Sequence, residues 1–127
     1  MDTAQALFDQ GQRLLAEGKV DDALIAFNSL LNRQFDAPEL LYLVADCLIK
    51  KGWNGAAINL LGVALQQRPE FSEAWNNLGV AFRHENFHNF ARAAWAKALA
   101  LGEPVEVFGN MGKAGGCAAS QTEAVAR

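Results

Sequence analysis

The sequence has little proline, little cysteine and no excess of positive charge. Three prolines in 127 residues leave room for long helices, because proline disrupts a helix interior. Its two cysteines, Cys47 and Cys117, are too few for a disulfide framework and lack the C-x-x-C spacing of zinc sites. The formal net charge is −3, and the basic residues are scattered singly apart from Lys50 and Lys51. We therefore expect no metal site and no nucleic-acid partner.

Long apolar runs are also missing. The run that begins at Leu40 is far too short to span a bilayer, and the first residues, Met1 to Ala4, have neither the basic start nor the apolar core of a signal peptide. Apolar residues nonetheless make up 51% of the chain, enough for a globular domain with a buried core. We expect a cytoplasmic protein with no membrane partner.

What the sequence does contain is self-similarity with a period of 34 residues. Small residues, turn-forming residues and large apolar residues each recur at this interval. A fixed period of this length is typical of stacked helix-turn-helix repeats. The matched positions are Gly11, Ala45 and Gly79; Leu14, Leu48 and Phe82; Gly18, Gly52 and Asn86; Ala23, Ala57 and Ala91; Phe27, Leu61 and Trp95; and Leu30, Ala64 and Ala98.

Each recurring residue type has a physical role in a pair of helices. The set that begins with Gly11 is small, which lets the two helices approach closely, and the set that begins with Phe27 fills the space between them. Gly18, Gly52 and Asn86 fall where the first helix of each pair ends. Glycine adopts the left-handed conformation of a helix end freely, and asparagine is the next best residue there.

The third repeat resembles the tetratricopeptide-repeat (TPR) family. The family pattern W-x2-L-G-x2-Y…A-x3-F is matched by Trp75, Leu78, Gly79, Phe82, Ala91 and Trp95. The resemblance implies an all-α solenoid of three helix-turn-helix units plus the start of a fourth, wound into a right-handed superhelix. We expect one TPR domain over 1–127, with units at about 4–37, 38–71 and 72–104 and a partial unit at 105–127.

The period predicts helices at about 2–17, 20–33, 38–51, 54–67, 72–85 and 88–101, and no strand. A fourth unit begins after Pro104, and Arg127 falls before the expected end of its second helix. An unfinished unit leaves the apolar face around Trp95 and Leu99 poorly covered. We expect either a frayed C-terminus beyond about Gly112 or a homodimer through this uncapped end.

No set of residues in the sequence predicts catalysis or a cofactor. His84 and His88 are four residues apart, but Asn86 interrupts the helix between them, so they do not share a face as metal ligands. The glycines between 109 and 116 lack the lysine and the preceding strand of a phosphate-binding loop. Cys117 has no basic neighbour to activate it, and Cys47 is expected to be a small core residue. We therefore expect that the chain is not an enzyme.

In the TPR family the first helix of every unit lines the concave face, and that face binds an extended peptide or a partner protein. The resemblance therefore implies a protein-interaction module. Carried over position by position, the peptide-binding residues are Phe8, Asp9 and Gln12 in the first unit; Tyr42, Leu43, Asp46 and Lys50 in the second; Asn76, Asn77, Val80, Arg83 and His84 in the third; and Asn110 in the fourth.

Two binding modes of the family can be compared with these residues. Chaperone-tail binders hold a C-terminal carboxylate with a Lys-Asn-Asn-Lys-Arg clamp, and this clamp is absent because the matching positions hold Phe8, Gln12, Leu43, Glu73 and Asn77. Repeats of the O-linked N-acetylglucosamine transferase type hold a peptide backbone with an asparagine before Leu-Gly. Asn77 and Asn110 match that pattern, whereas Asp9 and Leu43 depart from it. An amide suits this role because it both donates and accepts hydrogen bonds.

Three aromatic residues at the starts of second helices, Trp53, Phe87 and Phe90, lie where the repeat usually has polar residues. They either pack locally or form an exposed apolar patch that meets a partner. Two alternatives to an independent binding module stay open. The chain could present substrates as the N-terminal segment of a larger enzyme, such as a bacterial glycosyltransferase, or it could be a self-associating TPR protein.

Overall fold

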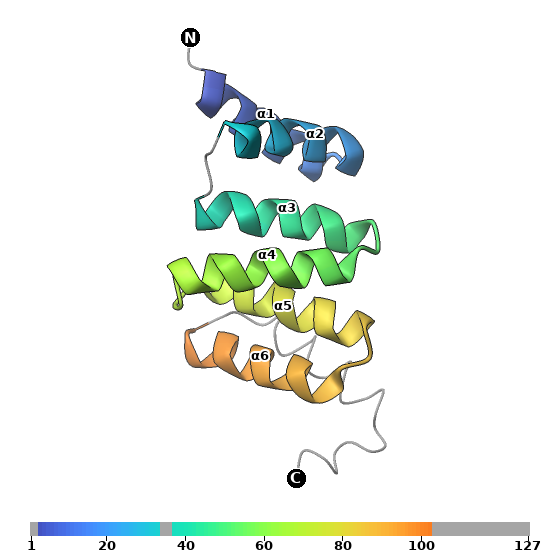
Figure 1. Cartoon of the computed structure of the whole chain (residues 1–127), viewed down its shortest axis with the longest axis vertical. Helices are drawn as coiled ribbons and strands as arrows, with labels where there is room; N and C mark the ends of the chain where they lie inside the picture. The colour runs from blue at the N-terminus through green and yellow to red at the C-terminus, as the bar shows by residue number, and fades with distance from the viewer. Residues whose placement is uncertain (1–2, 34–36, 103–127) are drawn as a thin grey trace. The chain divides into compact units, whose positions relative to one another are not determined.

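The computed structural model describes residues 3–33 and 37–102, which form six α-helices and, within these ranges, no strand (Figure 1). Every helix end lies within one residue of its predicted position, and the all-α prediction is confirmed. The helices are α1 (Thr3–Ala16), α2 (Val20–Asn32), α3 (Pro38–Lys50), α4 (Asn54–Gln67), α5 (Ser72–His84) and α6 (His88–Ala100). In the described part of the chain, no helix has the length and apolar character that crossing a membrane requires.

The chain falls into two compact units, one that ends at Arg68 and one that begins at Pro69. In unit 1, α1 packs on α2 and α3 packs on α4, so that this unit contains two hairpins. In unit 2, α5 packs on α6 as the third hairpin. The predicted pairing of helices is therefore confirmed. A single domain over 1–127 and a right-handed superhelix stay predictions, and the fourth repeat lies outside the described residues.

The turn inside each hairpin has the geometry that its sequence predicts. Gly18, Gly52 and Asn86 have φ angles of 80°, 85° and 67°, in the left-handed region. Each turn closes with the two backbone hydrogen bonds of a Schellman motif, for example Trp53 N to Leu48 O at 2.8 Å and Gly52 N to Ile49 O at 2.9 Å. The same pair of bonds recurs in the other two hairpins. Residues that tolerate this conformation therefore fix where every first helix ends.

Small residues on the first helices make room for large residues on the second helices. A Cβ atom on Gly11 would overlap the ring of Phe27, and a Cβ atom on Gly79 would overlap the indole of Trp95. Phe27 and Trp95 are fully buried. The Trp95 indole nitrogen, Nε1, also donates a hydrogen bond to the Asn76 carbonyl at 3.1 Å. These contacts confirm the role that the period predicts for Gly11 and Gly79.

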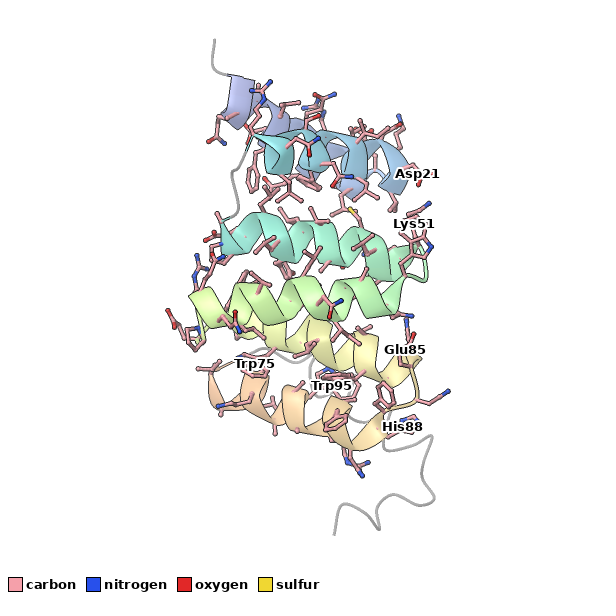
Figure 2. The ribbon with its side chains drawn as sticks, viewed as in Figure 1. Asp21, Lys51, Trp75, Glu85, His88 and Trp95 are labelled. Atoms are coloured by element: carbon pink, nitrogen blue, oxygen red, sulfur yellow. The ribbon has the colours of Figure 1, made fainter. Side chains whose placement is uncertain are left out.

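The two hairpins of unit 1 stack through α2 and α3. At one end of this contact Lys51, which follows α3, forms an ion pair with Asp21 in the first turn of α2 (Figure 2). The Lys51 ammonium also lies 5.3 Å from the centre of the Trp53 ring, within the range of a cation–π contact. Lys51 therefore links the first hairpin to the turn of the second.

The two tryptophans of unit 2 differ in burial, and one expectation needs correction. Trp75 is half-buried and packs against the buried core of its hairpin. Its Nε1 donates to the Pro69 carbonyl at 2.8 Å, and Lys97 Nζ lies 5.5 Å from its ring centre (Figure 2). Trp95, in contrast, is fully buried, so the prediction that it lies on a poorly covered face is wrong. The glycine opposite Trp95 accounts for this, because the indole sinks between the helices of its own hairpin. Leu99 is half-buried.

Candidate functional site

The first helix of the second hairpin presents the polar residues that the TPR resemblance implies. Tyr42, Asp46 and Lys50 are spaced by four residues on α3, so they lie along one face of the helix. Tyr42 and Asp46 are half-buried and Lys50 is exposed. Lys50 Nζ donates to Asp46 Oδ2 at 2.9 Å. The structure therefore brings these three predicted residues together in unit 1.

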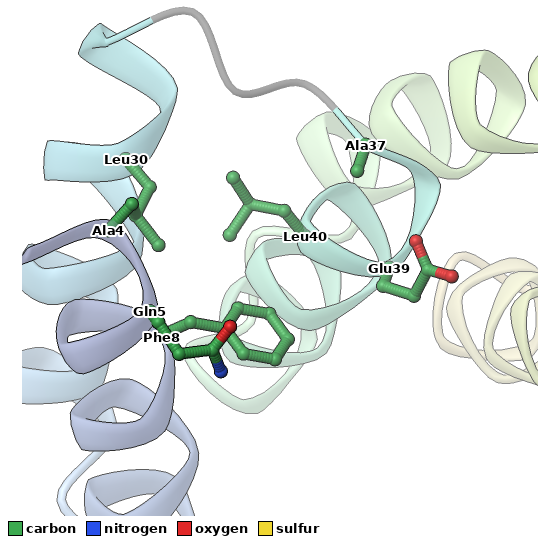
Figure 3. Close-up of a pocket in the computed structure, with 7 residues that line it drawn as sticks. All are labelled: Ala4, Gln5, Phe8, Leu30, Ala37, Glu39 and Leu40. Atoms are coloured by element: carbon green, nitrogen blue, oxygen red, sulfur yellow. The ribbon is translucent and has the colours of Figure 1, made fainter. Parts of the chain in front are cut away.

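A groove with two hollows lies between α1 and α3. The first hollow, of about 360 Å³, is mainly apolar, and Phe8, Leu30 and Leu40 face one another across it from α1, α2 and α3 (Figure 3). The second hollow, of about 260 Å³, lies nearer the last turns of the two helices. The remaining residues around the first hollow are Ala4, Gln5, Ala37 and Glu39, and those around the second are Gln12, Leu15, Ala16, Leu43 and Lys50.

The first hollow was not predicted from the sequence, although the period contains a signal for it. Ala37, at the N-cap of α3, is exposed and lines the hollow. The residue 34 positions later is Phe71, at the N-cap of α5, whose large side chain is only 7% exposed. At this position of the repeat, the second hairpin therefore has less side-chain volume than the third. Phe8, which the resemblance assigns to the binding face, lines this hollow and also packs on Phe27, with ring centres 6.2 Å apart.

The carboxylates near the groove differ in their partners. Glu39 pairs with Arg68, whose hydrogen bond holds the pKa of the carboxyl below its usual range. Asp46 pairs with Lys50. Asp9 is exposed and accepts a hydrogen bond from Gln5 Nε2 at 3.0 Å, but none of the ion pairs between described residues includes it. The groove therefore carries one exposed carboxylate that forms none of the ion pairs found between the described residues.

In unit 2 the corresponding face belongs to α5. Asn76, Asn77, Val80 and Arg83 are half-buried and His84 is exposed, and their spacing places all five within one side of the helix. Arg83 Nη2 and His84 Nε2 lie 3.3 Å apart, so these two side chains form one basic corner. The structure thus brings the predicted residues of the third unit together. Asn110 lies outside the described residues, and its part in an asparagine ladder stays a prediction.

The three aromatic residues at the starts of second helices are exposed: Trp53 by 55%, Phe87 by 49% and Phe90 by 62%. Phe87 and Phe90 belong to unit 2 and contact one another and Phe82, with ring centres 5.4–6.3 Å apart. Trp53 belongs to unit 1. Trp53 and Phe87 each follow the left-handed turn residue, where a Schellman motif favours an apolar contact with the helix end. Phe87 packs on Phe82 in this way, and a partner-binding patch formed by the three aromatic residues stays a prediction.

The described residues contain no group of three or more His, Cys, Asp or Glu side chains that could hold a metal ion. His84 closes α5 and His88 opens α6, on opposite sides of the left-handed Asn86. Cys47 is fully buried, as predicted. Burial, with a smaller effect from the neighbouring Asp46 carboxylate, raises the pKa of its thiol to about 11, so the reactive thiolate is scarce at neutral pH. Cys117 lies outside the described residues.

Solved structures of TPR domains resemble the chain closely in three dimensions. The TPR domain of Sgt2 from Aspergillus fumigatus matches with a TM-score of 0.84 and 18% identity, over 94% of this chain and 83% of that chain. The first TPR domain of human RPAP3 matches with a TM-score of 0.83 and 19% identity, over 92% of this chain and 93% of that chain. The first TPR of Spaghetti (RPAP3), bound to the HSP90 peptide SRMEEVD, matches with a TM-score of 0.82 and 18% identity, over 91% of this chain and 93% of that chain.

No family model and no curated protein matches the sequence. At 18–19% identity the structural likeness establishes the fold and leaves the ligand open. The repeated small residues, the left-handed turns and the three hairpins are the features that sequence and structure share. The chain therefore has the tetratricopeptide-repeat fold that its 34-residue period predicts.

Proposed function

We propose that the chain is a protein-interaction module that binds an extended segment of a partner polypeptide along its first helices. The observation that carries the proposal is the grouping of polar residues on the first helix of a hairpin in each unit, with two hollows between α1 and α3 in unit 1. A shallow helix face suits an extended ligand better than a compact one. The proposal is also supported by the structure of Spaghetti, a protein of the same fold that was solved with a peptide bound.

The ligand of this chain differs in kind from an acidic C-terminal tail. The two clamp positions on α1 hold Phe8 and Gln12, and the clamp position on α3 holds Leu43. The clamp positions on α5 hold Glu73 and Asn77. Without lysine or arginine at these positions, the charge-assisted hydrogen bonds that hold a terminal carboxylate cannot form. We expect the peptide SRMEEVD to bind poorly.

On α5, the binding face suits an internal peptide segment. The Asn77 amide can donate to a peptide carbonyl and accept from a peptide N–H, so it holds a backbone irrespective of sequence. Arg83 and His84 add donors that favour an acidic side chain of the ligand. A neutral hydrogen bond contributes only about 0.5–1.5 kcal/mol net, so affinity per contact is modest.

The test compares Asn77→Ala with Asn89→Ala. Peptides are first enriched from a random displayed library on the wild-type chain, and their affinities for both variants are then measured by fluorescence anisotropy. We expect Asn77→Ala to weaken binding by up to about tenfold. Asn89, on α6, hydrogen-bonds to Arg92 Nη2 at 2.8 Å and is the matched control, so its variant should bind as the wild type does. Equal affinities of the two variants would place binding elsewhere, with Trp53, Phe87 and Phe90 as the next candidates.

A further inference from the structure

The apolar hollow of unit 1 lies beside the exposed Asp9 carboxylate. Asp9 directly follows Phe8, whose ring lines the hollow. Gln5, four residues before Asp9, lines the first hollow, and Gln12, three residues after it, lines the second. Residues three and four apart on a helix are neighbours on its surface, so Asp9 lies on the rim of the groove between the two hollows.

The charges around the groove favour a basic ligand. Arg68 pairs with Glu39 and Lys50 pairs with Asp46, whereas Asp9 is exposed and belongs to none of the ion pairs between the described residues. A rim carboxylate of this kind attracts cationic groups and repels acidic ones. The same rim would repel an acidic tail such as SRMEEVD. This repulsion adds to the effect of the missing clamp residues.

The hollow itself favours one large apolar side chain. Leu30 and Leu40 form its walls and are buried, and Phe8 closes one side (Figure 3). Its volume of about 360 Å³ has room for a side chain the size of leucine or phenylalanine. Moving such a side chain from water into an apolar site is the main favourable contribution that one residue can make to binding.

We propose that the groove between α1 and α3 binds an extended peptide in which a leucine- or phenylalanine-sized residue fills the hollow and a lysine or arginine pairs with Asp9. The basic residue lies one or two positions from the apolar one, because an extended chain advances about 3.3 Å per residue and neighbouring side chains on a helix are about 5–6 Å apart. This inference rests on the proposed function and names the ligand chemistry for the first two hairpins.

The experiment enriches peptides from a random displayed library on the full chain and reads the motif. We expect an apolar residue with a lysine or arginine one or two positions away. A synthetic peptide of the enriched sequence is then measured against Ala37→Phe, which places a large ring at a residue that lines the hollow. Binding should fall by about tenfold or more, the effect of losing one buried large side chain. Ala56→Phe, at an exposed alanine of α4 outside the groove, should change binding by less than about twofold.

A second pair of variants tests the charge. Asp9→Lys should weaken the enriched peptide by about two- to fivefold, because an exposed ion pair contributes little, and the loss should shrink as salt is raised. Asp22→Lys makes the same change of charge at an exposed residue of α2 outside the groove and should leave binding within about twofold of wild type. Thermal unfolding of all four variants verifies that each is folded.

The outcomes separate this inference from the proposed function. Enriched peptides that lack a lysine or arginine beside the apolar residue, or that bind Ala37→Phe as tightly as wild type, overturn the groove assignment and leave a peptide-binding module with a different site. Failure to enrich any peptide contradicts both proposals. Loss of binding in Ala56→Phe equal to that in Ala37→Phe also overturns the groove assignment, because the hollow would then have no special role.

Discussion

The first and third hairpins join their helices differently from the second. In the first, Gly11 lies against Phe27, and in the third, Gly79 lies against Trp95. In the second hairpin the corresponding residues are Ala45 and Leu61, both fully buried. The aromatic residues of the second helices correspond to glycine on the first helices, and the smaller leucine corresponds to alanine. A larger side chain on one helix is therefore matched by a smaller one on the other.

This comparison shows that the repeat preserves the filled volume of a contact rather than the identity of its residues. Interiors are close-packed, and an added methyl group is accommodated only where the partner shrinks. In the third hairpin the indole of Trp95 also donates to the Asn76 carbonyl, which fixes the ring in place. The pairs therefore act as units, and single substitutions should be more harmful than matched ones.

The largest effect is expected from Gly79→Leu. The added side chain collides with the buried indole of Trp95, so the free energy of unfolding should fall by about 1–3 kcal/mol or more. Gly62→Leu is the control, because a Cβ atom there meets no atom within 4 Å and leucine favours the helix. Urea denaturation measures both. Equal midpoints for the two variants would show that the contact at Gly79 is not close-packed.

A matched exchange sharpens the comparison further. Gly79→Ala and Trp95→Leu together give the third hairpin the residue pair of the second. Each change alone should destabilise, the first by overpacking and the second by opening a cavity. In a double-mutant cycle, the combined variant should lose about 0.5–3 kcal/mol less free energy of unfolding than the two single variants lose in sum. Strict additivity would mean that the two residues do not form one packed unit.

The turns offer a smaller test of the same comparison. Gly52 and Asn86 occupy corresponding left-handed positions, with φ angles of 85° and 67°. Gly52→Ala should cost about 1–2 kcal/mol, because a Cβ atom is disfavoured in this conformation. Asn86→Gly should instead stabilise the protein slightly, by less than about 1 kcal/mol. Thermal unfolding measures both, and a rise in stability in Gly52→Ala would contradict the assigned turn.

The helix boundaries could be predicted from the sequence because single residues mark them. A left-handed residue such as Gly52 marks a helix end on its own, so boundaries follow within a residue. Packing between helices is less accessible from sequence. The half-burial of Trp75 depends on Lys97 and the Pro69 carbonyl, and the pair of Lys51 with Asp21 depends on how two hairpins stack. Neither contact follows from spacing along the chain.

The candidate site shows the same division. The polar residues on α3 and α5 were assigned to one face by the TPR resemblance, and their spacing of three or four residues agrees with one face of a helix. The hollow beside Phe8 could not be placed, because it requires side chains from three helices. The contrast between Ala37 and Phe71 was nevertheless a usable signal. The position of Trp53 after a left-handed glycine likewise predicts local packing before any partner is considered.

The central functional claim is that a partner binds the first helices. The most direct measurement is a two-dimensional amide NMR titration of the full chain with a peptide enriched from a random library. The account predicts that the largest shift changes fall in α1, α3 and α5, with Asp9, Asp46 and Asn77 among them. Changes concentrated instead on the second helices, around Trp53, Phe87 and Phe90, would contradict it.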